Sequence, residues 1–155
     1  MNIAKVNFEF REQLNKILGG AHHNYCYQCA ACVASCPAAR YSLEFNPRLI
    51  LQMTLYGLGE PLTCADSPIW LCTNCYTCYE RCPQDVRPIE VIIALKNLAA
   101  QQGTLPETVG KYAETVLETG RSTMITSAVN RRREELGLAP LPEVPMEEIK
   151  KLYGE

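Results

Sequence analysis

Eight of the nine cysteines in this 155-residue chain lie in two short runs, Cys26 to Cys36 and Cys72 to Cys82. Each run has the spacing C-x2-C-x2-C-x3-C followed by proline, and each cysteine of the second run lies 46 residues after its counterpart in the first. The second run is therefore an in-register internal repeat of the first. Soft thiolates at this spacing favour iron-sulfur chemistry, and the pattern is a known one for binding cubane clusters. It predicts two 4Fe-4S clusters.

The spacing also indicates how the chain would surround a cluster. Three cysteines at two-residue gaps let a tight turn reach three corners of a cubane, while backbone N–H groups face the sulfurs and stabilise the negative charge. Pro37 and Pro83 fix φ and lack an N–H, so each run ends in a bend that directs its last thiolate elsewhere. In two-cluster proteins of this kind the fourth cysteine binds the other cluster.

The predicted ligand sets are therefore crossed between the runs, so that neither run holds its cluster alone. The first set is Cys26, Cys29, Cys32 and Cys82, and the second is Cys72, Cys75, Cys78 and Cys36. No catalytic residue is predicted, because the sequence has no Ser-His-acid arrangement, no glycine-rich phosphate loop and no carboxylate pair with an evident role. The pattern indicates electron transfer, without catalysis by this chain alone.

Three other residues with metal-binding side chains are given structural interpretations. Cys64 lies between the runs and is interpreted as a small buried apolar side chain. His22 and His23 precede Cys26, and histidine can replace cysteine at a cluster. Because each cluster already has four thiolates, both are interpreted as loop residues, which can still tune a potential by hydrogen bonding to sulfur.

Composition limits the other classes of function. The formal net charge of -2 and the pI of about 5.8 give no reason to expect a nucleic acid partner. An odd cysteine count with metal-binding spacing favours a reducing cytoplasm over a disulfide scaffold. The N-terminus has no apolar signal region, and the apolar run 91–95 is too short to span a bilayer. A cytoplasmic protein without direct membrane insertion is expected.

Apolar residues recur at helical spacing and no segment alternates as a strand does, so the predicted fold class is all-α. Residues 2–18 predict an amphipathic helix with Ile3, Val6, Phe10, Leu14, Ile17 and Leu18 on one face. That face is expected to close the core, and the alternative is that it docks on a neighbouring subunit.

Further helix starts are predicted from local capping signals. They are Asn46-Pro47, Ser67-Pro68, Pro88 and a capping box over residues 104–107. Residues 131–133, three arginines, are interpreted as a solvated helix face. The predicted segments are 1–20, an amphipathic helix; 21–103, the dicluster domain; 104–137, C-terminal helices; and 138–155, a proline-rich tail with one short helix, which lies along the domain or reaches another chain.

Two such cysteine runs joined by helices resemble the α-helical ferredoxin module, and the whole chain resembles the C subunit of heterodisulfide reductase. The resemblance covers roughly residues 22–103. It is carried by 26–29 (CYQC), 46–50 (NPRLI), 69–78 (IWLCTNCYTC), 81–83 (RCP) and 86–91 (VRPIEV). It implies an iron-sulfur protein that relays electrons from a flavin-containing A subunit to the B subunit, whose CCG motifs reduce a heterodisulfide. This chain has no Cys-Cys-Gly motif, so the resemblance implies a relay and not the site of disulfide chemistry.

Two alternatives remain open. The chain could be the iron-sulfur subunit of a succinate, fumarate or glycolate type oxidoreductase. Such subunits usually add a plant-type cluster domain or CCG repeats, and this chain has too few other cysteines for either. It could also be a structural protein with two zinc sites, but zinc normally uses two C-x2-C pairs, which three closely spaced thiols fit poorly. Colour distinguishes them, because a cluster protein is brown and a zinc protein is colourless.

Overall fold

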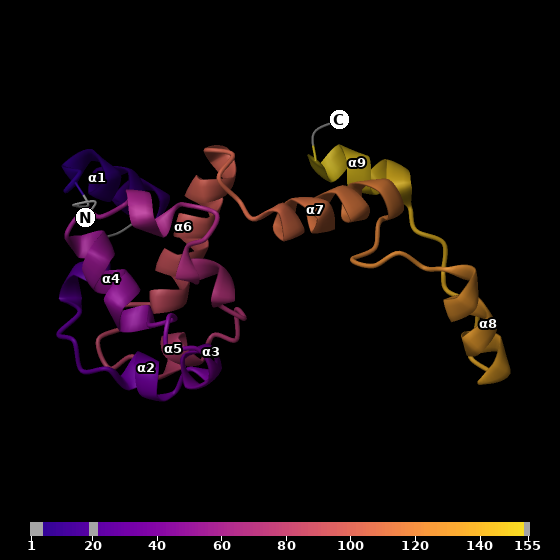
Figure 1. The fold of residues 1–155 in the computed structure, drawn as a ribbon, viewed down its shortest axis with the longest axis horizontal. Helices are drawn as coiled ribbons and strands as arrows, with labels where there is room; N and C mark the ends of the chain where they lie inside the picture. Colours follow the sequence, from indigo (N-terminus) through magenta and orange to yellow (C-terminus); the bar gives the residue numbers. More distant parts are fainter. Residues whose placement is uncertain (1–4, 19–21, 154–155) are drawn as a thin grey trace. The chain divides into compact units, whose positions relative to one another are not determined.

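The computed structural model describes residues 5–18 and 22–153, and every regular element within these ranges is a helix. The predicted all-α fold class is therefore confirmed. The chain divides into two compact units, residues 1–105 and 106–155, which are described separately. The first unit contains α1 to α6 and the second contains α7 to α9 (Figure 1).

The long helix α6 (Pro88–Gln101) is the centre of the first unit. It begins at Pro88, as predicted, and α1 (Phe8–Ile17), α4 (Pro47–Leu55) and α5 (Thr77–Glu80) all contact it. Figure 1 shows the short helices α2 (Ala31–Ala34), α3 (Pro37–Tyr41) and α5 grouped at the end of the unit away from α1. The buried side chains of α6 include Ile89, Val91, Ile92, Ala94, Leu95, Leu98 and Ala99. These side chains form the core of the unit, and α6 carries this core to the end where the cysteines lie.

Helix α1 is shorter than predicted. It begins at Phe8, because the Asn7 side chain accepts hydrogen bonds from the backbone N–H groups of Glu9 and Phe10 and caps it. Phe10 and Leu14 are buried in the core, which confirms that this face closes the core. The prediction is wrong for two positions and lies outside the described residues for a third. Val6 precedes the helix and is 56% exposed, Ile17 is 45% exposed, and Ile3 is not described.

Two other helix starts agree with their capping signals. Asn46 accepts a hydrogen bond of 3.0 Å from the backbone N–H of Leu49, with Pro47 as the first residue of α4. Ser67 caps η3 (Pro68–Leu71), a 3-10 helix, by accepting from the N–H of Ile69. A second 3-10 helix, η2 (Glu60–Leu62), precedes it. The connection between the cysteine runs is therefore helical, as predicted.

The predicted capping box at residues 104–107 is wrong. Helix α7 (Glu107–Thr119) begins after Pro106, and no side chain caps it. The Thr104 hydroxyl instead donates hydrogen bonds to the backbone carbonyls of Thr63 and Ala99. These contacts hold the end of the first unit together. Because the hydroxyl is used there, it is not available to cap α7, as the sequence pattern had predicted.

Gly57 is expected to be much less tolerant of alanine than Gly103. Both are left-handed, with φ of 72° and 69°, so alanine costs about 1 kcal/mol at either position. At Gly57 an added Cβ would also lie 2.5 Å from the carbonyl oxygen of Asn7, whose N–H donates to Gly57 at 2.9 Å, whereas nothing lies within 4 Å at Gly103. Gly57→Ala should destabilise the protein by about 3 kcal/mol in total.

Comparing Gly57→Ala with Gly103→Ala isolates the contact between the start of α1 and the end of α4, because the two glycines differ mainly in that contact. Anaerobic melting of the two variants provides the measurement. Equal losses in the two variants would show that the close approach to Asn7 is not an important constraint.

The second unit consists of α7, α8 (Ser127–Glu135) and α9 (Met146–Tyr153). Helix α9 packs on α7, and the Val144, Met146 and Ile149 side chains close over Gly120 at the end of α7. The last helix of the tail therefore lies along α7 of its own chain. Arg131 and Arg132 are exposed, which confirms the solvated helix face there. Arg132 pairs with Glu135 at 2.9 Å, and Arg133 is partly buried.

Candidate metal centre

The first cysteine run is built around a turn in the left-handed conformation. Gln28 and Ala30, on either side of Cys29, have φ of 62° and 64°. Each costs a non-glycine residue about 1 kcal/mol or more, so the structure around the turn must hold this conformation. The Ala30 carbonyl then accepts from the N–H groups of Val33 and Ala34, both at 3.0 Å, and starts the four-residue helix α2.

The second run repeats this backbone. Asn74 and Tyr76 have φ of 52° and 60°, and the Tyr76 carbonyl accepts from Tyr79 and Glu80 to start α5. These residues lie 46 positions after Gln28, Ala30, Val33 and Ala34. The sequence repeat is therefore a repeat of structure, and α2 and α5 pack against each other.

The eight cysteines line two hollows of similar size, with about 290 and 300 Å³ of empty space when open solvent at the mouth is included. Each hollow takes three cysteines from one run and one from the other. The first is lined by Cys26, Cys29, Cys32 and Cys82, and the second by Cys72, Cys75, Cys78 and Cys36. These groups have the same members as the two predicted ligand sets.

The loop after the second run positions Cys82 in the first hollow. Asp85 and Arg87 are both left-handed, with φ of 49° and 56°, and two hydrogen bonds of 3.1 Å join their side chains. Between them, the backbone N–H of Val86 donates to the Cys82 sulfur at 3.3 Å. The corresponding Cys36 is the residue before α3, where Pro37 takes the first helical position. The positions of Cys82 and Cys36, the last cysteines of their runs, are thus each set by the residues that follow them.

The polar groups around the hollows fit a negatively charged cluster. Gln28 donates from its side-chain amide to the Cys26 sulfur at 3.4 Å. In the lining of the same hollow, the donor Nε of Arg48 is buried without a hydrogen-bond partner. Beside the second hollow, the Lys96 ammonium donates to the Cys72 carbonyl at 3.1 Å and to the Asn74 side chain at 3.3 Å. Donors near sulfur and nearby cations stabilise such clusters.

The thiols at the centre of each set resist ionisation in the protein alone. Burial, followed by the neighbouring Cys26, raises the pKa of Cys32 to about 11. Burial, followed by repulsion from Cys72, raises the pKa of Cys78 to about 12. By contrast, a hydrogen bond with Thr77 lowers the pKa of the exposed Cys75. Four thiolates in one hollow therefore require positive charge, which iron supplies on binding with release of protons.

The histidines and the ninth cysteine line neither cysteine hollow. His22 and His23 form a 3-10 helix (His22–Tyr25); His23 is buried, and its burial, followed by Arg11, lowers its pKa. Cys64 is exposed, so the prediction of a buried apolar side chain is wrong. It sits in an irregular turn, where its thiol donates to the Pro61 carbonyl at 3.6 Å. In the described residues no three His, Cys, Asp or Glu side chains are grouped for a single metal ion.

Replacing Cys64 with serine is expected to leave the iron content unchanged. Its thiol is exposed and lines neither of the two hollows that hold the other eight cysteines. Iron and acid-labile sulfide, measured per chain on anaerobically purified protein, should equal those of the unaltered protein. A loss of iron in Cys64→Ser would assign the residue a part in cluster binding or assembly that its position does not suggest.

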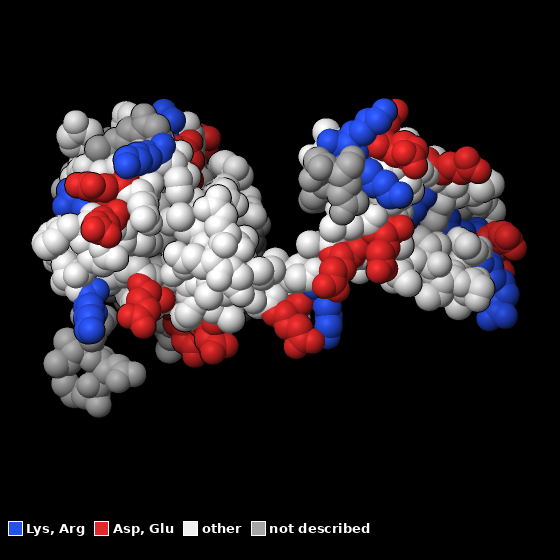
Figure 2. Space-filling view, turned by 90° about the horizontal axis from the view of Figure 1, so that it is seen from above, with Lys and Arg blue, Asp and Glu red and all other residues white. Residues whose placement is uncertain are grey.

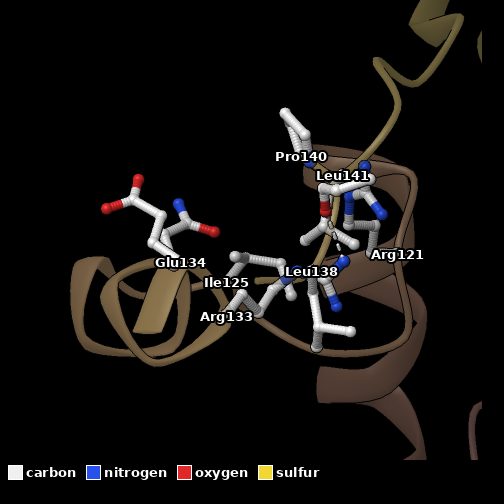
Figure 3. Close-up of a pocket in the computed structure, with 9 residues that line it drawn as sticks. Arg121, Ile125, Arg133, Glu134, Leu138, Pro140 and Leu141 are labelled. Carbon is white, nitrogen blue, oxygen red and sulfur yellow. Dashed lines mark hydrogen bonds between the residues drawn. The ribbon is translucent and has the colours of Figure 1, made fainter. Parts of the chain in front are cut away.

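A larger pocket in the second unit contains no cysteine. It has about 880 Å³ of empty space, open solvent included, and its lining includes Arg121, Arg133, Glu134, Leu138 and Leu141. Figure 3 shows the Glu134 side chain pointing away from the Arg121 side of the pocket. Both guanidinium groups already donate to backbone carbonyls, Arg121 to Pro142 and Arg133 to Ala139. The chemistry of the chain therefore lies in the two smaller hollows.

Comparison with known proteins agrees with this location. The model of the 4Fe-4S dicluster domain family matches residues 25–86, which include both cysteine runs. The iron-sulfur C2 subunit of CoB–CoM heterodisulfide reductase from Methanocaldococcus jannaschii is 40% identical over 84% of this chain and 72% of the relative. The iron-sulfur C subunit of CoB–CoM heterodisulfide reductase from Methanopyrus kandleri is 36% identical over 95% and 82%. The C subunit of ferredoxin:CoB–CoM heterodisulfide reductase from Methanosarcina mazei is 34% identical over 91% of each chain.

None of the helices in the described ranges is both long enough and apolar enough to cross a membrane. The matched domain accounts for two 4Fe-4S clusters, and the all-helical fold is the α-helical ferredoxin type with helices added at both ends. Identity to these relatives extends well beyond the cysteine runs. The chain belongs to the family of heterodisulfide reductase iron-sulfur C subunits.

Proposed function

We propose that this chain relays electrons within a heterodisulfide reductase-like complex through two clusters with crossed ligand sets. The first cluster would be held by Cys26, Cys29, Cys32 and Cys82, and the second by Cys72, Cys75, Cys78 and Cys36. The observation that carries the proposal is that these two groups of four each line one hollow. When bound, a 4Fe-4S cluster supplies one-electron chemistry.

The protein brings the two ligand sets close together. Cys32 and Cys78, the buried thiols of the two sets, pack in one apolar cluster with Ile89 of α6. They are close enough for Cys32 to contribute to the raised pKa of Cys78. Because Cys36 and Cys82 each belong to one run and line the hollow of the other, the chain also links the two sets directly. An electron on one cluster would therefore have a short, dry path to the other.

Each hollow also has one edge at the surface. Cys29 and Cys75, the middle cysteines of the two runs, are exposed. Tyr27 and Tyr76 beside them are 58% and 49% exposed. Figure 2 views the first unit from the side of α1, opposite the cysteine-bearing end, and much of that face carries neither acidic nor basic residues. Exposed aromatic side chains such as Tyr27 and Tyr76 suit docking of other proteins near the cluster edges.

The proposed donor is a flavin-containing A subunit, the proposed acceptor is the CCG-motif B subunit, and the proposed location is the cytoplasm. The family supports assembly with other heterodisulfide reductase subunits. Open thiolate sets of this kind need a reducing compartment, which supports the location. Reduction of a heterodisulfide would take place on the acceptor protein, because this chain has no CCG motif.

Anaerobic purification of the tagged protein from its native source tests this proposal. The expected result is a brown complex with a flavoprotein and a CCG-motif protein, identified by mass. Rapid mixing should show the reduced flavoprotein bleaching the visible absorption of the clusters, and protein stripped of iron provides the control. Isolation with a succinate- or fumarate-type flavoprotein would support the alternative oxidoreductase, and a colourless zinc protein would contradict electron transfer altogether.

A further inference from the structure

The wall of the first hollow contains a cationic side chain with an unused donor. Arg48 lies in the first turn of α4 and lines the hollow together with Cys26, Cys29, Cys32 and Cys82. Its Nε is buried and has no hydrogen-bond partner. Arg48 also takes part in none of the ion pairs found among the described residues. Arg48 thus brings to the wall of this hollow a buried donor for which the protein supplies no acceptor.

This placement is unfavourable unless something negative fills the hollow. A buried donor without an acceptor loses its hydrogen bond to water and gains nothing in return. The first turn of a helix already carries partial positive charge, which opposes a second positive charge there. The oxygen that caps this helix, Oδ1 of Asn46, already accepts from the N–H of Leu49. A bound cluster with its sulfide and thiolate sulfurs would provide the missing acceptor.

The second hollow has no corresponding cation in its lining. Beyond its four cysteines it is lined by apolar, aromatic and threonine side chains, including Phe45, Thr73 and Tyr76. Lys96 reaches this site only from outside, through the Cys72 carbonyl and the Asn74 side chain, with its ammonium 5.9 Å from the centre of the Trp70 ring. The two sites are therefore alike in thiolates and in size, but unlike in the charge that faces the cluster.

We propose that Arg48 donates its Nε–H to a sulfur of the first cluster and raises the reduction potential of that cluster above the value its thiolates alone would give. The inference rests on the ligand sets proposed above. Reduction adds negative charge to a cluster, so a hydrogen-bond donor and a cation at the sulfurs stabilise the reduced form more than the oxidised form. Arg48 is thus a positioning residue that makes the two clusters unequal.

Redox titration of the holoprotein, followed by electron paramagnetic resonance, tests the assignment. Arg48→Met should lower the potential of the first cluster and leave the second unchanged, and Arg48→Lys, which keeps the charge but not the Nε donor, should restore part of the loss. Lys96→Met serves as the matched control and should move only the second cluster. An unchanged first potential in Arg48→Met, or equal shifts of both clusters, would overturn the inference.

A second measurement detects the proposed contact in the unaltered protein and uses Arg48→Lys only as the control. In holoprotein grown with arginine labelled with ¹⁵N at Nε, electron spin echo spectra of the reduced first cluster should contain a ¹⁵N coupling. Labelled Arg48→Lys, with its other arginines intact, should lack it. Absence of the coupling in the unaltered protein refutes the role of Arg48 while the clusters stay in place. Absence of the clusters themselves would instead refute the proposed function.

Discussion

Replacing Cys82 with alanine is expected to remove the cluster of the first hollow and to spare that of the second, although Cys82 belongs to the second cysteine run. Its sulfur lines the hollow of Cys26, Cys29 and Cys32, where the N–H of Val86 holds it at 3.3 Å. Iron and sulfide per chain should fall to about half, because one of two clusters is lost. The remaining paramagnetic signal should be that of the second cluster.

Cys36→Ala provides the mirror experiment and should remove the second cluster. Cys36 lines the hollow of Cys72, Cys75 and Cys78. The two variants should therefore retain different signals, each matching one component of the unaltered protein, and Cys64→Ser serves as the control with full iron. If each loss were confined to the cluster of the run that carries the substitution, the crossed ligand sets would be wrong.

Removing the iron is expected to abolish the order of the cysteine runs while much of the helical core persists. Helices α2 and α5 have four residues each, far below the length at which an isolated helix is stable. The turns before them contain four non-glycine residues in the left-handed conformation. Without a cluster, nothing offsets this strain or the repulsion and burial of the thiols.

Hydrogen exchange followed by mass spectrometry measures this directly. Protein stripped of iron with an anaerobic chelator should exchange fast in residues 26–36 and 72–87, with protection reduced by orders of magnitude. Helix α6 should keep part of its protection through its apolar contacts with α1 and α4, and α7 should be unaffected. Unchanged protection in both runs would mean that the cysteine-bearing end folds without metal.

Local signals in the sequence were sufficient for most helix starts. The amide of Asn46 and the hydroxyl of Ser67 cap the next turn, and Pro47 and Pro88 open their helices, because all the atoms involved lie within a few residues. The crossed grouping of cysteines was expected from the known pattern of two-cluster proteins with this spacing, and the same groups of four line the two hollows. These features depend on short stretches of chain.

Features that depend on distant parts of the chain could not be read in this way. Thr104 has the sequence of a capping residue, yet the carbonyl of Thr63, 41 residues away, takes its hydroxyl. Cys64 is exposed in an irregular turn, although Leu62 and Thr63 just before it are buried, and its residue type did not reveal this. Helices α2 and α5 are too short to produce a periodic pattern. No local signal in the sequence distinguishes Arg48, and its place in the lining of the first hollow depends on the tertiary fold.

The most direct test of the central claim is a crystal structure of the anaerobically purified protein, with anomalous diffraction recorded at the iron absorption edge. The account predicts two cubane clusters per chain, each bound by three thiolates from one cysteine run and one from the other, with Cys82 on the first cluster and Cys36 on the second. A cluster bound by all four cysteines of one run, or a single metal ion in either hollow, would contradict it.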